Sequence, residues 1–246
     1  MKWLRSIVLF DKGGVIQSDD WKAIHESFVR SIQSIDNPLG SGSLKIRKID
    51  FYIGRDGKKK SRRNGVVYLR KRFLEHIVAT EKWTQESQVL VNKKVEVEVE
   101  QEKKNKTLKK LTLYPSGEEH EEAKGAKFGD FDFLTTGPGG HKVAIEWETG
   151  NVSSSHRALN KLCICLEKGI ISAGVLIVPS RELYTHITDR IGNIFELNPY
   201  LSFWQRVGDT VTKGLLVVAV VEHDELTTDV NLPYLKVGLD GNADKA

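Results

Sequence analysis

Four acidic residues lie on either side of a Gly/Pro turn in the stretch DFDFLTTGPGGHKVAIEWET, residues 130–149. Asp130 and Asp132 precede the turn, and Glu146 and Glu148 follow it. Both flanking runs alternate polar and apolar residues, which is typical of two strands joined as a hairpin. Carboxylates in this arrangement could bind a metal ion or accept protons, but they could also form the ordinary wet face of a sheet.

The length of the loop decides whether these carboxylates meet. A loop of four residues would place Asp132 opposite Ile145 and mix acidic with apolar residues on one face. A loop of three residues, 138–140, places Asp132 opposite Glu146 and the two outer carboxylates opposite each other. We favour the shorter loop, because burial of one apolar face is what fixes the register of a strand pair. The other face then holds Phe131, Phe133, Val143, Ile145 and Trp147.

Carboxylates that face one another across a strand pair repel, so stacking several on one face requires a compensating cation. Mg²⁺ takes one or two carboxylate oxygens together with water and substrate phosphate oxygens. Alternatively, the face is solvated and balanced by the lysines of KKNKTLKK, residues 103–110. The local pattern leaves both interpretations open.

Composition indicates a soluble, globular chain. It has 246 residues, 39% of them hydrophobic and 28% charged, with a net charge of +4, which permits a polyanionic partner without requiring one. The basic residues are concentrated in RDGKKKSRR (55–63) and in the 103–110 run. Solvated loops explain either run alone, and together they leave room for phosphate contacts. Cys163 and Cys165 are expected to be buried thiols in a reducing cytosol.

The elements that must position the carboxylates form an α/β pattern. Helices are expected at residues 19–35, 64–86, 153–168 and 180–193. The apolar runs ISAGVLIVP and KGLLVVAVV are expected to be strands buried on both faces. Residues 95–115 look like a strand, a charged turn and a second strand, followed by a linker at 116–129. No membrane span is expected, and the apolar run at the start, which ends at Asp11, is too short for a signal peptide.

A long stretch of this sequence resembles one family. VAIEWETGNVSSSHRALNKL, followed by LIVPSRELYTHITDRIGNIFELNPYLSF, is similar to the BamHI family of type II restriction endonucleases. The family's D…ExE core is matched by Asp132, Glu146 and Glu148, and its helix ending in a further active-site glutamate is matched by 64–86 with Glu86. The resemblance covers most of the chain from about residue 64.

The resemblance implies a mixed central sheet flanked by helices, of the PD-(D/E)xK nuclease type, in a single domain over 1–246. It implies a cytoplasmic, prokaryotic homodimer that hydrolyses double-stranded DNA with Mg²⁺ at a short palindrome, protected by a cognate methyltransferase. The palindrome would be GGATCC or another GATC-centred site, cut to leave 5′ overhangs.

The same resemblance assigns roles to residues. Asp132 and Glu146 would bind the metal, Glu148 would accept a proton from water where most nucleases of this fold carry lysine, and Glu86 would approach as a further carboxylate. Asp130 is expected in the outer shell or facing solvent. The expected DNA-contacting residues are Asn151, Ser153, Arg157, Asp189, Arg190, Gly238 and Asp240.

Two departures from the family limit these expectations. Residues 87–129 look like an insertion with an added charged hairpin. This sequence ends in DGNADKA, where the family's C-terminal arm continues into a basic tail. In the family that arm reaches the minor groove of the DNA, so it bears on which outer base pairs the protein would recognise.

Two other functions compete with this interpretation. SIVLFDKGGVIQSD (6–19) resembles the first motif of haloacid-dehalogenase-type phosphatases, with Asp11 as the nucleophile, but Gly13 replaces the motif's second aspartate. A DNA-binding protein without catalytic activity is the second alternative, and retention of every acidic match argues against it.

Overall fold

The computed structural model describes residues 1–37, 40–81, 126–188 and 190–236, with the backbone alone for 126–130 and for short strands at 95–99, 110–112 and 119–121, and Ser116. Predictions that concern Glu86, Asp189, Gly238, Asp240 or the basic run at 103–109 lie outside the described residues.

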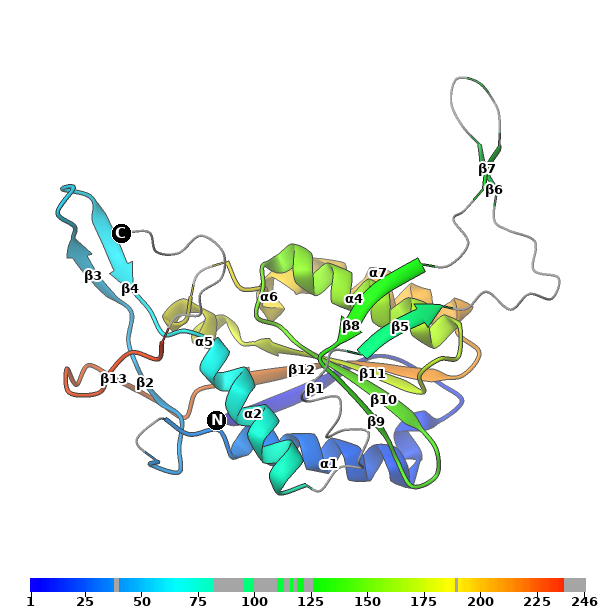
Figure 1. The fold of residues 1–246 in the computed structure, drawn as a ribbon, viewed down its shortest axis with the longest axis horizontal. Helices are drawn as coiled ribbons and strands as arrows, with labels where there is room; N and C mark the ends of the chain where they lie inside the picture. The colour runs from blue at the N-terminus through cyan, green and yellow to red at the C-terminus, as the bar shows by residue number, and fades with distance from the viewer. Residues whose placement is uncertain are drawn as a thin grey trace.

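A five-stranded mixed sheet forms the centre of the molecule (Figure 1). Its strands, in spatial order, are β1 (Lys2–Lys12), β12 (Gly214–Glu222), β11 (Ala173–Pro179), β10 (Lys142–Trp147) and β9 (Phe133–Thr136). The three inner strands are parallel, and the two edge strands pair antiparallel to their neighbours. This confirms the predicted α/β class with a mixed sheet.

Helices cover both faces of the sheet. Figure 1 shows α1 and α2 on one side and α4, α6 and α7 on the other. The helices are α1 (Asp19–Gln33), α2 (Val67–Ala79), α4 (Val152–Glu167), α5 (Arg181–His186), α6 (Ile194–Leu197) and α7 (Leu201–Val207), with 3-10 turns at η1 (Val15–Gln17), η2 (Asn198–Tyr200) and η3 (Gly208–Thr210). Every residue of β11 is buried, as its continuous apolar run predicts, because two hydrophobic clusters sandwich it.

The β9–β10 hairpin has the predicted register. Phe133 lies opposite Ile145 and Thr136 opposite Lys142, so Asp132 falls beside Glu146 just beyond the paired residues. The apolar residues Phe133, Val143, Ile145 and Trp147 share one core cluster, as expected. The prediction for Phe131 is wrong: it packs in the cluster on the other face of the sheet. The reason is a bend at Asp132, between β8 (Ala126–Phe131) and β9, which interrupts the alternation.

The turn of this hairpin is anchored to α1. Asp20, in the first turn of the helix, accepts hydrogen bonds from the backbone N–H groups of Gly139 (2.8 Å) and His141 (3.0 Å). A side chain at Gly137 would collide with the Asp20 carboxylate, so the close approach requires glycine there. The anchor fixes the turn that sets the register of the carboxylates.

Three predicted elements differ in the structure. Both strands expected within 95–115 are present, β5 (Val95–Val99) and β6 (Lys110–Thr112), but they do not pair with each other as the expected hairpin required. β5 pairs with β8, and β6 pairs with β7 (Glu119–Glu121), which lies in the expected linker. The helix predicted over 180–193 ends at His186, because Ile187 adopts an extended conformation and bridges to Asn64.

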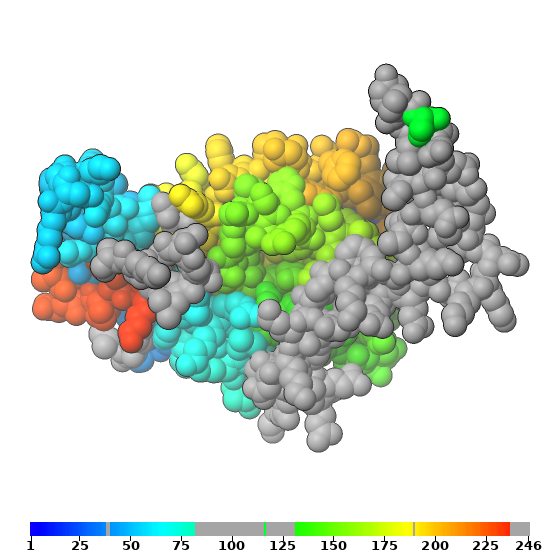
Figure 2. Space-filling view, turned by 45° about the horizontal axis from the view of Figure 1, so that its top comes forward, coloured from blue at the N-terminus to red at the C-terminus, as the bar shows by residue number. Residues whose placement is uncertain are grey.

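A separate hairpin projects from the body at one end. It consists of β3 (Asp50–Ile53) and β4 (Lys59–Arg62) and follows β2 (Lys45–Arg47), which pairs with β13 (Glu225–Thr227). Figure 2 shows it in cyan at the end of the molecule where the red-orange residues of the β13 region also lie. Within the described residues, no helix has the length and apolar character needed to cross a membrane.

Candidate functional site

Asp132 occupies the bend at the start of β9, with both carboxylate oxygens engaged. The main-chain N–H of Trp147, the last residue of β10, donates a hydrogen bond to Oδ2 at 2.8 Å. This bond takes the place of a main-chain hydrogen bond between the two strands. Arg70, from α2, donates to Oδ1 at 2.6 Å. The carboxylate is therefore held in place by the next strand and carries a cationic partner.

Glu146 points from β10 toward α4, where its side chain is only 12% exposed. The Lys161 ammonium forms an ion pair with it, and the same ammonium lies 4.7 Å from the centre of the Phe131 ring. Burial raises the pKa of Glu146 to about 7, and the nearby negative charge of Asp132 adds to the rise against the opposing effect of Lys161. This location therefore requires a cation to keep the carboxylate ionised.

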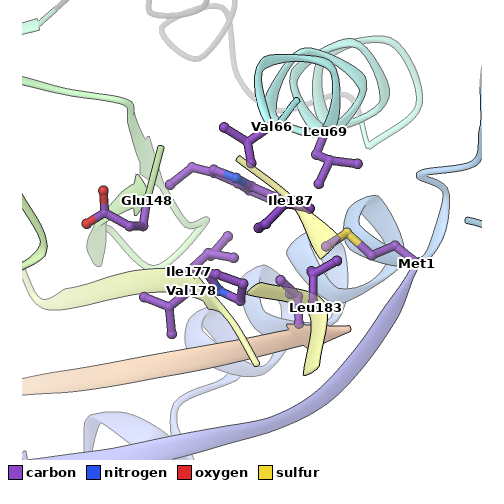
Figure 3. A pocket seen from close by; sticks show the side chains of 11 residues that line it. Met1, Val66, Leu69, Glu148, Ile177, Val178, Leu183 and Ile187 are labelled. Atoms are coloured by element: carbon purple, nitrogen blue, oxygen red, sulfur yellow. The ribbon is translucent and has the colours of Figure 1, made fainter. Parts of the chain in front are cut away.

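Glu148 is 5% exposed and follows the end of β10. Its carboxylate accepts hydrogen bonds from the Gly150 N–H at 2.6 Å and from the Ser155 hydroxyl. Burial nonetheless raises its pKa to about 7. Figure 3 shows the carboxylate pointing away from the apolar side chains of Met1, Leu69 and Ile187, which line a cavity of only about 10 Å³ behind it. That cavity is too small for a substrate.

A larger cavity, of about 340 Å³, lies in front of the three carboxylates. Asp132, Glu146 and Glu148 line it from the sheet, and Ser154, Arg157 and Lys161 line it from α4. The serine and the two basic residues recur at helical spacing, so one face of α4 looks into the cavity. Acidic and basic side chains thus face each other across this cavity.

The donor set fits a hard divalent cation. Asp132 and Glu146 supply carboxylate oxygens at the same cavity, and each is now balanced by a basic side chain, Arg70 or Lys161. Glu148 turns instead toward Ser155, and no group of three His, Cys, Asp or Glu side chains in the described part of the chain could hold a metal ion. Two carboxylates with room for water and phosphate match the preference of Mg²⁺ better than that of a metal bound only by protein.

Of the predicted DNA-contacting residues that the structure describes, Arg157 lines this cavity, and Asn151 and Ser153 lie at the start of the same helix. Asn151 caps α4, because its side chain accepts a hydrogen bond from the Ser154 N–H at 3.2 Å. Ser153 and Arg157 are exposed on the first turns of the same helix. Arg190 is exposed and has a φ of 74°, a strained backbone conformation for a residue other than glycine.

The segment that carries Arg190 is tied to the start of α4. The Gly192 N–H donates to the Gly150 carbonyl at 3.0 Å. A side chain at Gly192 would collide with Ser155, so only glycine allows this approach. Both segments with predicted DNA contacts are therefore held together beside Glu148.

Three residues of the site were not predicted: Arg70, Ser155 and Lys161. A signal for Lys161 existed, since Ser154, Arg157 and Lys161 recur at helical spacing and therefore share one face of the helix. The counter-charge for Glu146 thus comes from α4; the lysines of 103–109, offered as the balance for a solvated face, lie outside the described residues.

Other candidate residues lie away from the cavity. Asp11 accepts a hydrogen bond from the Val15 N–H at 2.9 Å and so closes the turn after the edge strand β1. Burial raises the pKa of Cys163 to about 12 and that of Cys165 to about 11, as expected for inert buried thiols. The side chain of Asp130 lies outside the described residues.

Two known proteins are similar in sequence to part of this chain. The type II restriction enzyme OkrAI of Oceanobacter kriegii is 45% identical over 105 residues, covering 43% of this chain and 52% of that protein. The type II restriction enzyme BamHI of Bacillus amyloliquefaciens is 34% identical over 100 residues, covering 41% of this chain and 43% of that protein. The matched stretches thus span about half the length of these relatives. The model of the family described as restriction endonuclease BamHI matches residues 1–242. Because that match spans nearly the whole chain, this protein belongs to the BamHI restriction endonuclease family.

Proposed function

We propose that this protein is a type II restriction endonuclease that hydrolyses phosphodiester bonds of double-stranded DNA in the presence of Mg²⁺. The observation that carries the proposal is the cavity shared by Asp132, Glu146, Glu148 and the first turns of α4. Membership of the BamHI family and the two relatives named as type II restriction enzymes support it.

Asp132 and Glu146 would hold the metal ion, which would polarise the phosphate and lower the pKa of a bound water. Both carboxylates are held in orientation by hydrogen bonds or ion pairs before any ligand arrives. Lys161, which lines the same cavity, would then face the phosphate and offset its charge.

Glu148 would accept the proton of the attacking water. A carboxylate whose pKa lies near 7 takes up a proton efficiently at neutral pH, and Glu148 accepts from two donors that keep its oxygens oriented. The water oxygen would bond to phosphorus as its proton passes to Glu148, and the bond between phosphorus and the leaving oxygen would break. The leaving oxygen would take up a proton from solvent water, and Glu148 would return its own proton to solvent. The products are a terminal phosphate and a hydroxyl.

DNA bases would be contacted by Asn151, Ser153, Arg157 and Arg190, together with Asp189, Gly238 and Asp240. An arginine pairs with guanine O6 and N7, and an aspartate accepts from cytosine N4, so Asp189 and Arg190 suit a G·C pair. We infer by family resemblance a GGATCC or other GATC-centred palindrome, cut to leave 5′ overhangs. A cytoplasmic homodimer with one nuclease domain per chain and a cognate methyltransferase completes the proposal.

Incubation with plasmid DNA and Mg²⁺, followed by sequencing of the ends, tests the function. We expect discrete cuts at one palindrome, lost in Glu146→Gln and retained in Glu182→Gln, an exposed glutamate of α5. Random degradation or intact plasmid would contradict the proposal. DNA binding without cleavage would identify an inactive DNA-binding protein, and phosphate-ester hydrolysis lost in Asp11→Asn would identify a phosphatase.

A further inference from the structure

The β3–β4 hairpin is exposed on both faces. All eight residues of its two strands are exposed, and the strands pair from Asp50 with Arg62 to Ile53 with Lys59. A two-stranded ribbon that buries neither face gains little from hydrophobic packing. Its side chains therefore contribute little to the core and are available to a partner.

This hairpin contains one of the two dense basic runs of the chain. Residues 50–63 contain six basic residues, Arg55, Lys58, Lys59, Lys60, Arg62 and Arg63, against the acidic Asp50 and Asp56. The resulting net charge of +4 equals that of all 246 residues. A net charge of +4 within 14 residues favours contact with a polyanion at this end of the molecule.

Aromatic rings hold two of the cations on the ribbon. The Lys59 ammonium lies 4.5 Å from the centre of the Phe51 ring, and the Arg62 guanidinium lies 4.7 Å from the centre of the Tyr52 ring. These contacts restrict the long basic side chains without neutralising them. Phe51 remains 54% exposed.

The base of the hairpin is fixed to the segment that precedes Arg190. The buried Asn64 donates through Nδ2 to the carbonyls of Arg47 (2.8 Å) and His186 (2.9 Å), and its own carbonyl accepts from the Thr188 N–H (2.7 Å). From this base, a four-residue strand extends about 13 Å, the length of about four base pairs. The ribbon can thus reach phosphates outside the bases that Arg190 would contact.

We propose that the β3–β4 hairpin binds the phosphate backbone of duplex DNA that flanks the recognition sequence. This rests on the proposed function, because the nearby residues Asn151 and Arg190 are assigned to bases of the same duplex. Excess positive charge and cations restrained on an exposed ribbon favour the closely spaced phosphates of duplex DNA over other acidic partners.

The test compares Lys58→Gln/Lys59→Gln/Lys60→Gln with a control of equal charge, Lys22→Gln/Lys142→Gln/Lys213→Gln. The control residues are exposed and lie at the opposite end of the sheet, near the first residues of α1, β10 and β12. Each protein is titrated with EDTA-treated duplexes of two lengths, one limited to the cleaved palindrome and one with ten further base pairs on each side. Thermal melting checks that all variants fold.

We expect the hairpin variant to lose affinity for the long duplex, with the slope of log Kd against log salt reduced by about 2.7 for three phosphates. Affinity for the short duplex should match that of the control. An unchanged slope on the long duplex, or an equal loss on the short one, would overturn the hairpin proposal while wild-type cleavage leaves the proposed function intact. Wild-type protein that neither binds nor cuts duplex DNA would instead overturn the proposed function, and the hairpin proposal with it.

Discussion

The hydroxyl of Ser155 donates a hydrogen bond to the carboxylate of Glu148, so a side chain of α4 controls a charge at the end of β10. Ser155 is fully buried, and the helix that carries it begins with Asn151, a predicted base-contacting residue. The proposed proton acceptor and the proposed recognition helix are thus linked by one hydrogen bond.

Replacing Ser155 by alanine should raise the pKa of Glu148 further, because the hydroxyl stabilises the ionised carboxylate. A hydrogen bond to a charged group contributes about 1.5–3 kcal/mol, which corresponds to a shift of about one to two pH units. We expect the acidic limb of the pH–rate profile for DNA cleavage to move to higher pH by that amount. As a control, Ser31→Ala removes a buried hydroxyl of a different helix, α1, and should leave the pH–rate profile unchanged. A profile unaffected by Ser155→Ala would argue against Glu148 as the proton acceptor.

The stability of the metal-free protein should depend on the two buried glutamates. Glu146 and Glu148 have a pKa of about 7 in the folded protein and about 4.5 in the unfolded chain, so the folded state binds more protons between these values. Their contribution is complete below about pH 4.5 and is lost as the pH rises through about 7, at most about 3 kcal/mol per group.

Thermal melting in EDTA at pH 5 and pH 8 checks this sign. Taking the difference in Tm between wild type and Glu148→Gln at each pH cancels the effect of the other titrating groups. We expect the variant to have the higher Tm at pH 8. Added Mg²⁺ should raise the Tm of wild type more at pH 8 than at pH 5. A difference that does not change with pH would show that Glu148 ionises normally.

Lys161 should compete with the metal ion for Glu146, because its ammonium already forms an ion pair with that carboxylate. We expect Lys161→Met to bind Mg²⁺ about tenfold more tightly by calorimetry, a change of about 1.4 kcal/mol. Without metal, the same variant should melt at a lower temperature, since a buried carboxylate is left unpaired. Lys168→Met, an exposed lysine at the end of the same helix, serves as the control. Equal or weaker Mg²⁺ affinity in Lys161→Met would exclude the competition.

The register of the hairpin was predictable from sequence because one face had to be apolar. Phe133, Val143 and Ile145 satisfy that requirement in the structure. Phe131 does not, since the Asp132 carboxylate accepts the Trp147 N–H and the strand bends there. Alternation is thus a reliable guide only where the backbone ladder continues, and here it stops at a proposed metal ligand.

Contacts between elements were not predictable from local pattern. The partners Arg70, Ser155 and Lys161 reach the carboxylates from two helices, and the rotation of a helix relative to the sheet depends on packing across the whole interface. Strand β5 likewise pairs with β8 rather than with the next strand in sequence. A single sequence without that packing shows which residues share a face but not which faces meet.

Asn64 joins three segments for which DNA contacts are proposed. It is fully buried and bonds to Arg47 at the base of the β3–β4 hairpin, to residues 186–188 before Arg190, and through Oδ1 to the Leu235 N–H (3.2 Å), three residues before Gly238. Asn64→Asp keeps the size of the side chain but replaces the NH2 group, which donates two hydrogen bonds, with an oxygen. That oxygen would face the carbonyls of Arg47 and His186. Each lost bond that leaves a buried group unpaired is unfavourable by about 1–3 kcal/mol.

We expect Asn64→Asp to lower the discrimination between the cognate site and sites with one substituted base pair, measured as a ratio of kcat/KM, by about tenfold. The Mg²⁺ affinity should not change, because the three carboxylates are bonded to other residues. Asn160→Asp introduces the same charge on α4 and retains the acceptor for the Trp204 indole, so it should discriminate like wild type. A melting temperature that falls in Asn64→Asp while the discrimination ratio is unchanged would assign Asn64 a purely structural role. A fall in the ratio would instead mean that this one buried amide positions the segments that contact the bases.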